Sequence, residues 1–314
     1  MSDRPVIAVT GASGFIGGHI VRTLIEHGYG VRGLTRRVAP EDSEVDWVTG
    51  ALDDDTALRR LIDGAAAVVH LAGAVKALNR DDFFRHNADG VTRLVNVVAA
   101  VAPDARLIHV SSLAAREPGL SDYAASKRAG ELALRPFADR LALNVLRPPA
   151  VYGPGDLETL RLFQMAARGW VLTPGVADQR MSLIHVADLT MAVLALLHAA
   201  PTGLEPVEID DGADGGHAWP DIARAAMDAV RREARVIAVP APVLMVAGLA
   251  GSLFARMTGR PSMISWTKAS ELTHPDWRAR PSPIPGFTPR WTIGNGFKDA
   301  VNWANSRGLL RSYN

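Results

Sequence analysis

The sequence contains no cysteine among its 314 residues. It therefore has no disulfide bond, no thiolate nucleophile and no cysteine metal site, and one argument for secretion is removed. Its charge is nearly balanced, at +1 at pH 7, so no general attraction to nucleic acid is expected. The nine histidines form no cluster with the spacing of metal ligands, which predicts that no metal is bound.

Long hydrophobic runs are also scarce. One stretch, Val236 to Ala255, lacks charged side chains, but Pro240 and Pro242 break it near its start. The helical run that remains from about Val243 is shorter than the roughly 20 apolar residues that a membrane span needs. We therefore expect a buried or surface-lying helix and no transmembrane segment. The N-terminus, Met1 to Pro5, lacks the apolar core of a signal peptide, so a cytoplasmic location is the default.

The first half of the chain alternates short apolar runs with helical patterns, which is typical of a parallel sheet covered on both faces. The expected strands are Val6–Thr10, Gly30–Leu34, Val45–Thr49, Ala67–Leu71, Arg106–Ser111 and Leu143–Leu146. The expected helices between them include Phe15–His27, Asp55–Ile62, Phe83–Val101 and Tyr123–Leu134. This pattern predicts an α/β fold, a doubly wound parallel sheet of the Rossmann type.

Beyond Tyr152 the composition changes to mixed helix and loop, rich in proline and tryptophan. Such segments cannot form an independent large sheet, so we expect a smaller C-terminal substrate-binding lobe. The predicted division is a dinucleotide-binding domain at 1–152, open to a later strand from the second half, and mostly substrate-binding lobe at 153–314.

A glycine-rich loop joins the first strand to the first helix. Gly11, Gly14 and Gly17 have the spacing that lets backbone approach a pyrophosphate at a helix N-terminus. The strand before it, the helix after it and the next strand at the right distance favour a bound dinucleotide over an ordinary turn. The expected cofactor contacts of this loop are Gly11, Ser13, Gly14, Phe15, Ile16 and Gly17.

The second strand ends in Thr35-Arg36-Arg37, where an NAD enzyme usually places an acid against the ribose 2′-hydroxyl. A guanidinium pairs with a 2′-phosphate, which a carboxylate would repel. We predict NADP as the cofactor, with NAD as the alternative. Arg36 is the main expected contact, Arg37 the second and Thr35 a hydroxyl donor; two solvated arginines are the other interpretation.

Two further segments follow strands of the expected sheet. Asp53 comes after the third strand, where an acid can accept from the adenine amino group, although the neighbouring aspartates could equally cap a helix. His70 ends the fourth strand before Leu71, Ala72 and Gly73, whose small size lets the chain pass close to the cofactor. We interpret His70 as a packed strand residue, and the three residues after it as cofactor contacts.

A serine, a tyrosine and a lysine downstream of the glycine loop are the candidate catalytic residues. Tyr123 and Lys127 lie four residues apart in a helical segment, so both side chains point from one face. The lysine ammonium favours the ionised phenol and lowers its pKa, and it can also hold the nicotinamide ribose. Ser112, after the fifth strand, can hydrogen-bond the substrate oxygen. Each of these motifs also occurs by chance in other proteins. Here all three residues come in the expected order on the expected strand and helix, which favours a catalytic set.

These motifs resemble the extended branch of the short-chain dehydrogenase/reductase superfamily, which holds NAD(P)-dependent epimerases, dehydratases and 3β-hydroxysteroid dehydrogenase-like enzymes. The resemblance covers almost the whole chain, through Thr10–Gly17, His70–Gly73, Asn87–Leu94, Val110–Ser112, Tyr123–Lys127, Arg147–Pro148, Val151–Pro154 and Ile184–Asp188. It implies hydride exchange at nicotinamide C4 with the tyrosine as acid/base, and Pro148 beside the cofactor.

The same resemblance implies that Asn87 helps to fix the active-site backbone, although a plain helix residue is an equal alternative. It implies that His185 and Asp188 form a structural hinge. It also implies a homodimer paired through the helices from Phe83 and from Tyr123.

The substrate is narrowed by two departures from the nucleotide-sugar pattern. Ala150 stands where those members usually carry an asparagine that meets the sugar-nucleotide phosphate, and Arg180 is displaced by one residue. Together with the apolar segment from Val243 to Phe254, this resembles the hydroxysteroid dehydrogenase and dihydroflavonol reductase side of the branch. That segment could line a substrate pocket, or form lobe core or a subunit contact.

We therefore expect an NADP-dependent oxidoreductase that interconverts a secondary alcohol and a bulky, apolar ketone. A nucleotide-sugar epimerase or dehydratase is the second hypothesis. A non-catalytic NAD(P)-binding protein is the third, and the intact catalytic set argues against it.

Overall fold

The computed structural model describes residues 4–37, 44–258 and 266–310. Its chain divides into two compact units. Unit 1 comprises residues 1–147, 190–208 and 282–288, and unit 2 comprises residues 148–189, 209–281 and 289–314.

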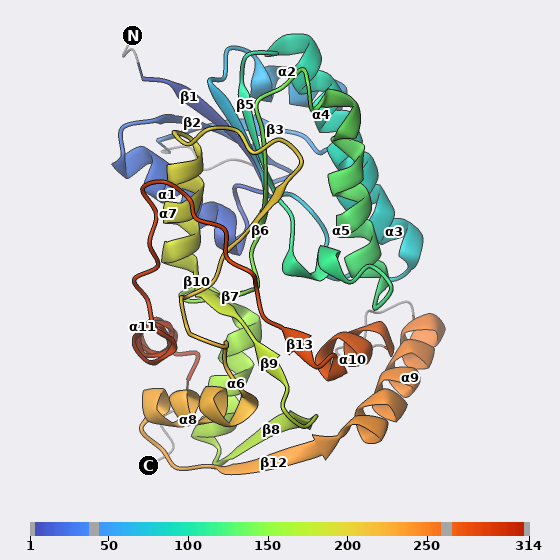
Figure 1. The fold of residues 1–314 in the computed structure, drawn as a ribbon, viewed down its shortest axis with the longest axis vertical. Coiled ribbons are helices and arrows are strands. Elements are labelled where there is room, and N and C mark those ends of the chain that lie inside the picture. The colour runs from blue at the N-terminus through green and yellow to red at the C-terminus, as the bar shows by residue number, and fades with distance from the viewer. Residues whose placement is uncertain (1–3, 38–43, 259–265, 311–314) are drawn as a thin grey trace. The chain divides into compact units, whose positions relative to one another are not determined.

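Unit 1 is built on a parallel sheet of seven strands (Figure 1). Their order across the sheet is β11 (Pro206–Glu208), β6 (Leu143–Arg147), β5 (Arg106–Val110), β4 (Ala67–His70), β1 (Val6–Thr10), β2 (Gly30–Thr35) and β3 (Val45–Thr49). The order reverses direction between β1 and β4, which is the switch point where such sheets bind ligands. The predicted doubly wound parallel sheet is confirmed.

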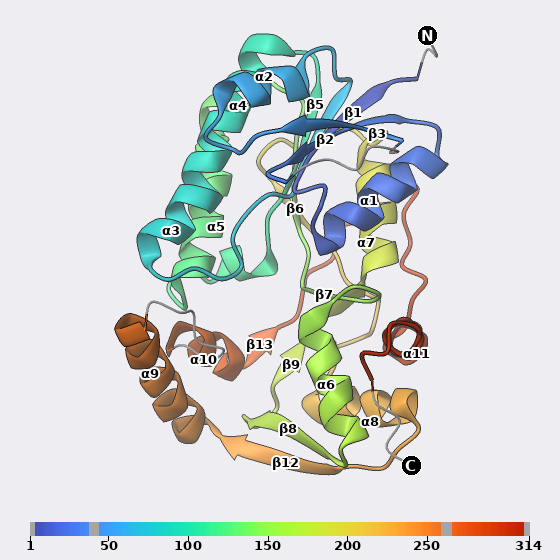
Figure 2. The same ribbon diagram turned by 180° about the vertical axis from the view of Figure 1, so that it is seen from behind.

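Helices cover both faces of this sheet. They are α1 (Phe15–Glu26), α2 (Asp55–Ile62), α3 (Arg80–Phe84), α4 (Gly90–Val101), α5 (Asp122–Ala133) and α7 (Val186–Leu196), the last belonging to unit 1 from Thr190. In the two opposite views, α2, α4 and α5 lie over one face, and α1 and α7 over the other (Figure 2). A hydrogen bond of 3.2 Å from Thr23 to Thr190 joins α1 to α7. Because both faces are covered, the central strand β4 is buried along its whole length.

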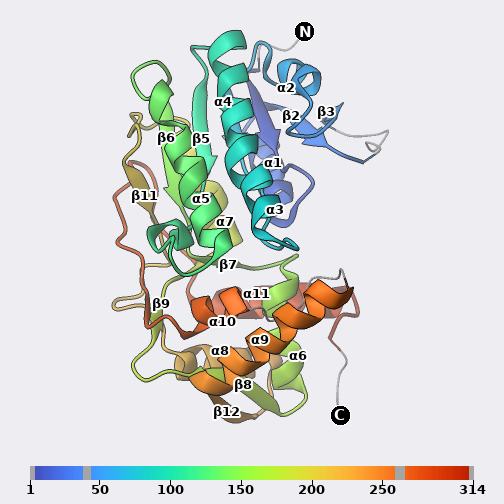
Figure 3. The same ribbon diagram turned by 90° about the vertical axis from the view of Figure 1, so that its right-hand side faces the viewer.

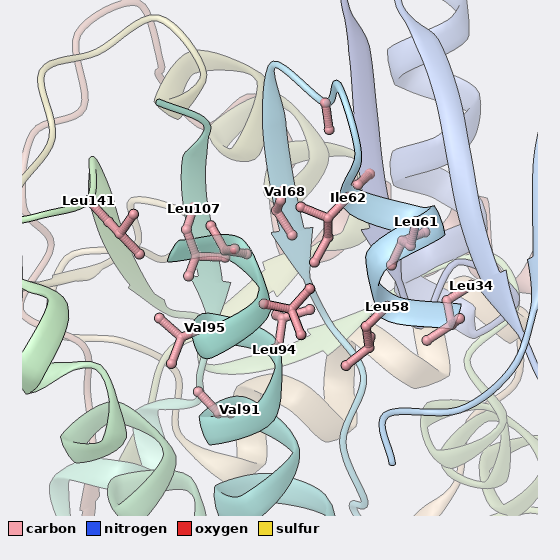
Figure 4. Packing of buried hydrophobic residues seen from close by; sticks show 14 of the residues in the cluster. Leu34, Leu58, Leu61, Ile62, Val68, Val91, Leu94, Val95, Leu107 and Leu141 are labelled. Carbon is pink, nitrogen blue, oxygen red and sulfur yellow. The ribbon is translucent and has the colours of Figure 1, made fainter. Parts of the chain in front are cut away.

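The core of unit 1 lies between the sheet and helices α2 and α4. Figure 4 shows Leu58, Leu61 and Ile62 of α2 and Leu94 of α4 pointing toward Val68 of the sheet. These side chains are completely buried. Such burial stabilises the fold by about 1.5–3 kcal/mol for each large aliphatic side chain. It therefore fixes the strand ends from which the loops emerge.

The seventh strand comes from the second half of the chain. Strand β11 pairs with β6, with Val207 opposite Leu146. It begins with Pro206, which has no N–H to donate and is tolerated because β11 lies at the edge of the sheet. A strand of three residues carries too little periodicity to be recognised in advance.

The segment expected to be one helix from Phe83 to Val101 begins earlier and is not uniform. The side chain of Asn79 accepts from the N–H of Asp82 at 2.9 Å and starts α3 at Arg80. A π-helical turn, Arg85–Asp89, then separates α3 from α4. Such turns insert one extra residue and often occur at functional sites, and this one contains Asn87.

Unit 2 combines short strand pairs with five helices in its described part (Figure 3). Its strands are β7 (Ala150–Tyr152), β8 (Trp170–Gly175), β9 (Arg180–Met181), β10 (Leu183–His185), β12 (Arg235–Pro240) and β13 (Asp276–Trp277). Its helices are α6 (Leu157–Ala167), α8 (Trp219–Val230), α9 (Ala241–Thr258), α10 (Trp266–Thr273) and α11 (Ile293–Ser306). The strands pair two by two, as β10 with β7, β12 with β8 and β13 with β9. This agrees with the expectation that the second half forms no large sheet of its own.

A core of aromatic and small side chains holds unit 2 together. The ring of Phe297 on α11 meets Tyr152 at 5.0 Å and Phe163 at 5.1 Å, both edge to face. Alanines of α8 and α11, among them Ala223 and Ala300, are buried in the same cluster. Small residues let these helices approach closely around the aromatic rings.

Candidate active site

The glycine loop between β1 and α1 has the close approaches that the spacing predicts. Gly11 has a φ of +71°, a conformation that suits glycine, and a Cβ there would lie 2.9 Å from the backbone nitrogen of Ala72. A Cβ on Gly17 would overlap the carbonyl oxygen of Gly11. Since Gly14 has no side chain to cap α1, the first N–H groups of the helix remain available to an anion. The loop therefore fits a dinucleotide pyrophosphate.

The other predicted residues of this loop occupy its outer part. Ser13 and Gly14 are exposed at the turn, while Phe15 and Ile16 are half-buried at the start of α1. The ring of Phe15 stacks edge to face on His19 at 5.8 Å. This packing anchors the helix start below the open turn.

The carboxyl ends of β1 and β4 are linked by Thr10. Its hydroxyl oxygen accepts from the N–H groups of Leu71 and Ala72, both at 3.2 Å. The same hydroxyl lies 2.7 Å from Nδ1 of His70, within hydrogen-bond distance. These bonds hold the loop after β4 against the glycine loop.

His70 is a buried residue of β4. It is completely buried and stacks on His109 of β5 with 5.3 Å between ring centroids. Burial, reinforced by the positive charge of Lys127, lowers the pKa of His70 to about 3. The same two causes hold the pKa of His109 well below its ordinary value. Both imidazoles therefore remain uncharged across the physiological range.

The end of β2 presents its arginines as expected. Arg36 and Arg37 are exposed, and Thr35 is buried with its hydroxyl oxygen accepting from the N–H of Arg37 at 3.1 Å. Arg32, earlier on β2, is bound to Asp46 at 2.8 Å and donates to the backbone carbonyls of Arg60 in the last turn of α2 and of Asp63 after it. Of the arginines on and after β2, Arg36 and Arg37 are the ones placed at the carboxyl end of the strand.

The structure separates the aspartates that follow β3. Asp54 caps α2, since its side chain accepts from the N–H of Ala57 at 3.0 Å. Asp55 lies in the first helical turn, where a negative charge is favourable. Asp53 is exposed before the cap. Asp54 and Asp55 thus occupy the start of α2, and Asp53 lies outside the helix.

Asn87 in the π-helical turn holds the loop after β4. Its Oδ1 accepts from the N–H of Ala74 at 2.7 Å, and its Nδ2 donates to the carbonyl of Ala74 and to Ser126 Oγ, both at 2.9 Å. A Cβ on Gly73 would lie 2.7 Å from Oδ1 of the same side chain. Asn87 therefore ties Ala74, in the loop after β4, to Ser126 of α5.

Ser112, Tyr123 and Lys127 lie at the end of β5 and on α5. Ser112 follows β5 and caps a short 3₁₀ turn, accepting from the N–H of Ala114 at 3.2 Å. Tyr123 is half-buried with its ring against Phe83 at 6.1 Å. Lys127 Nζ donates to the carbonyl of Val110 at 3.0 Å. That bond ties α5 to β5 two residues before Ser112.

Burial changes the acid/base behaviour of Lys127. The desolvation of its ammonium lowers the pKa of Lys127 to about 8, while the negative charge of Glu131, one turn further along α5, opposes this shift. The side chain is therefore charged at neutral pH but close to its titration range. A cation with this position and pKa can favour an ionised phenol one helical turn away.

A buried ionic network lies behind Lys127 and was not anticipated. Glu131 accepts from Arg147 in a bidentate pair, at 2.8 and 2.6 Å, and from Ser111 Oγ at 2.6 Å. Arg147 also lies 3.7 Å from Glu208 of β11. Burial alone would raise the pKa of Glu131, but the hydrogen bonds of Arg147 and Ser111 lower it. The spacing of Lys127 and Glu131 on one helix face was the available signal.

The remaining predicted residues belong to unit 2. Pro148 is buried directly after β6, and Ala150 is exposed on β7. Asp188 accepts from the N–H groups of Arg290 and Trp291 at 3.0 and 2.9 Å, and His185 stacks on Trp291 at 4.1 Å. The last two residues thus fasten the chain before α11, a structural role.

Comparison with known proteins supports the sequence resemblance. A family model described as NAD dependent epimerase/dehydratase family matches residues 7–209. The chain is 43% identical to the ceramide reductase of Caulobacter vibrioides over 312 residues, which cover 98% of this chain and 96% of that protein. It is 24% identical to a 3 beta-hydroxysteroid dehydrogenase/Delta 5-->4-isomerase of Mycobacterium tuberculosis over 64% of this chain and 62% of that one.

Solved structures show the same fold. The UDP-glucuronic acid 4-epimerase of Bacillus cereus, in complex with NAD, superposes with a TM-score of 0.70 at 18% identity and 96% coverage of both chains. The protein gox2253 superposes with a TM-score of 0.76 at 18% identity, covering 98% of this chain and all of the other. With its fold, glycine loop and near full-length relative, this chain belongs to the NAD-dependent epimerase/dehydratase family and is an NAD(P)-dependent oxidoreductase of the extended short-chain dehydrogenase/reductase type.

Proposed function

We propose that this protein is an NADP-dependent reductase of a long-chain lipid ketone. The observation that carries the proposal is the placement of Ser112, Tyr123 and Lys127 beside the carboxyl ends of the sheet strands, with Lys127 bound to β5. The near full-length relative named ceramide reductase supports a ceramide-like lipid as the substrate class.

The three side chains have separate roles in this proposal. The cofactor, when bound, supplies the hydride that reaches the carbonyl carbon. Ser112 donates a hydrogen bond to the carbonyl oxygen and fixes its position. Tyr123 transfers its phenolic proton to the same oxygen, which completes the alcohol. Lys127 holds the ribose and stabilises the phenolate that Tyr123 becomes.

In this proposal, the loops at the carboxyl ends of the strands would hold the cofactor. The glycine loop and the start of α1 hold the pyrophosphate, with Ser13, Phe15 and Ile16 beside it. Leu71, Ala72 and Gly73 line the other side, Asp53 meets the adenine, and Pro148 lies near the nicotinamide end. Arg36, with Arg37 and Thr35, holds the 2′-phosphate.

The cofactor preference gives one expected result. Arg36→Ala should raise the Kd for NADPH by roughly ten- to a hundredfold, because a charged hydrogen bond to the phosphate is lost. NADH has no 2′-phosphate, so its Kd should change little. Titration of the cofactor-free protein with both nucleotides measures the two values. Arg22→Ala, an exposed arginine on α1, serves as the control, and equal losses for both nucleotides would remove the 2′-phosphate argument.

The reaction itself is tested by two linked measurements. Denaturing the purified protein and quantifying the released nucleotide distinguishes an exchanging reductase from an enzyme that keeps its cofactor. We expect little bound NAD, preference for NADPH, and NADPH oxidation with long-chain 3-oxo amides but not with UDP-sugars. Stoichiometric tightly bound NAD would favour the nucleotide-sugar epimerase, and nucleotide binding with no turnover of any ketone would favour a binding protein.

We also propose a cytoplasmic homodimer paired through the helical segments α3–α4 and α5. Among the described residues, the helices are all too short or too polar to cross a membrane. The dimer rests on the family resemblance, and light scattering of the purified protein measures its mass.

A further inference from the structure

Unit 2 carries an apolar surface to which the roles proposed above assign no contact. From Val236 to Ala255 the chain has no charged side chain, yet several large apolar residues of this stretch are exposed. Ile237, Val243, Val246, Leu249 and Phe254 are called the apolar face below, while Val236, next to Ile237 in the strand, is exposed on the other side. Several exposed apolar residues on one segment indicate an interaction site, because moving each side chain out of water lowers the free energy.

Helix α9 presents this face outward. Val243, Val246 and Phe254 recur at helical spacing, and Val246 is 68% exposed. On the opposite side, Gly248 is buried and Leu244 is half-buried. A surface helix normally places polar residues outward, so α9 has the reverse pattern. Figures 1 and 3 show β12 running directly into this helix.

The strand before the helix extends the apolar face. In β12, Ile237 pairs with Leu172 of β8 in parallel register. Partners in register point to the same side of a sheet, and both of these side chains are about two-fifths exposed, at 41% and 42%. The two-stranded ribbon thus adds a second apolar row next to α9 in the chain.

Arginines border the uncharged stretch at both ends. Arg231, Arg232 and Arg235 are exposed just before it, and Arg256 and Arg260 follow it in the sequence. From 231 to 260 the chain has five arginines and a single acidic residue, Glu233, although the whole protein is nearly neutral. An apolar surface bordered by arginines complements an anionic lipid surface, with headgroup phosphates at the rim and acyl chains at the centre.

We propose that β12 and α9 dock this protein on the surface of an anionic phospholipid membrane. The apolar face enters the boundary between headgroups and acyl chains, and Arg231 and Arg235 contact the lipid phosphates. The biological purpose of this docking rests on the proposed function, because a reductase of a long-chain ketone must meet a substrate that resides in a bilayer. The docking itself is inferred from the exposed apolar residues and the neighbouring arginines.

The test is flotation of the full-length protein with vesicles of phosphatidylcholine alone, or with about one third phosphatidylglycerol. We expect strong flotation with the anionic vesicles, and weaker flotation in high salt, which screens the arginines. The double variant Val243→Asp, Val246→Asp should lower anionic-vesicle binding by roughly tenfold or more. Arg231→Gln and Arg235→Gln should each weaken it by about fivefold and leave the phosphatidylcholine signal unchanged.

Leu157→Asp is the matched control for the charged substitutions. Leu157 on α6 is 59% exposed and lies outside the apolar face, so its replacement should leave flotation unchanged. Thermal melting and NADPH titration check that every variant is folded. The salt titration needs no variant and tests the proposal even if the double variant fails to fold.

Two results would overturn the proposal. The first is a wild-type protein that stays unbound with both vesicle types. The second is a double variant that floats as well as the wild type; if its mass in solution also falls from dimer to monomer, the apolar face is a contact between copies. Flotation does not depend on turnover, so an inactive protein that floats would reject the proposed reductase and keep the docking surface.

Discussion

Tyr123→Phe should lower kcat for ketone reduction by roughly 10²- to 10⁴-fold, the range for loss of a positioned acid. The phenyl ring retains the edge-to-face contact with Phe83, so the local fold and the NADPH Kd should stay nearly unchanged. Phenylalanine has no proton to transfer to the carbonyl oxygen. Stopped or continuous NADPH oxidation with a long-chain ketone measures kcat, and fluorescence titration measures the Kd.

Tyr29→Phe provides a control for this substitution. Tyr29 lies in the same unit, and its hydroxyl is 2.8 Å from Nε2 of His198 on an exposed part of the surface. Removing that hydroxyl should leave kcat within the error of the wild-type value. Full activity of Tyr123→Phe would reject the tyrosine as the acid, and with it the roles assigned to Ser112 and Lys127.

Arg147→Met should reduce the free energy of unfolding by about 3–5 kcal/mol, the cost of leaving one buried charge without its partner. Glu131 would retain the hydrogen bonds of Ser111 and Arg128 but lose the bidentate pair. Urea unfolding monitored by circular dichroism measures the change. The double variant Arg147→Met, Glu131→Leu removes both charges, so it should recover a large part of the loss.

The difference in unfolding free energy between the wild type and Arg147→Met should depend on pH. The hydrogen bonds and charge of Arg147 keep the pKa of Glu131 depressed despite burial, so the pair stabilises the fold above the ordinary pKa of a glutamate. That contribution is lost as the pH falls through the depressed value. The gap between wild type and Arg147→Met should therefore narrow in acid. A gap that widens in acid, or Arg147→Met as stable as the exposed control Glu158→Gln, would contradict the assignment.

Much of unit 1 follows from local sequence. Each strand from Val6 to Arg147 is a short apolar run, and the glycine spacing marks the turn into α1. These signals are local because a strand buried on both faces needs apolar residues throughout, and a backbone that approaches another chain segment needs glycine. Ser112, Tyr123 and Lys127 could be recognised for the same reason. Ser112 directly follows a strand, and Tyr123 and Lys127 share one face of a helix.

Other features depend on residues far apart in the chain, and only the tertiary structure decided them. Strand β11 is too short to be recognised from its sequence. Its place beside β6 is set by pairing with residues that lie far away in the chain. The pair of Glu131 and Arg147 shows no pattern until α5 and β6 meet. The apolar residues on the outward side of α9 could equally have been buried in the core. An uncharged sequence indicates low polarity, but it does not indicate whether other segments cover it.

The sequence by itself thus determined most of the strand and helix pattern, the glycine loop and the candidate catalytic residues, because these depend on local spacing and backbone geometry. The tertiary structure decided which charges are buried together, which loop Asn87 holds, and which apolar residues remain at the surface. Those outcomes depend on packing between distant segments, where burial changes the free energy of each charge and each apolar side chain.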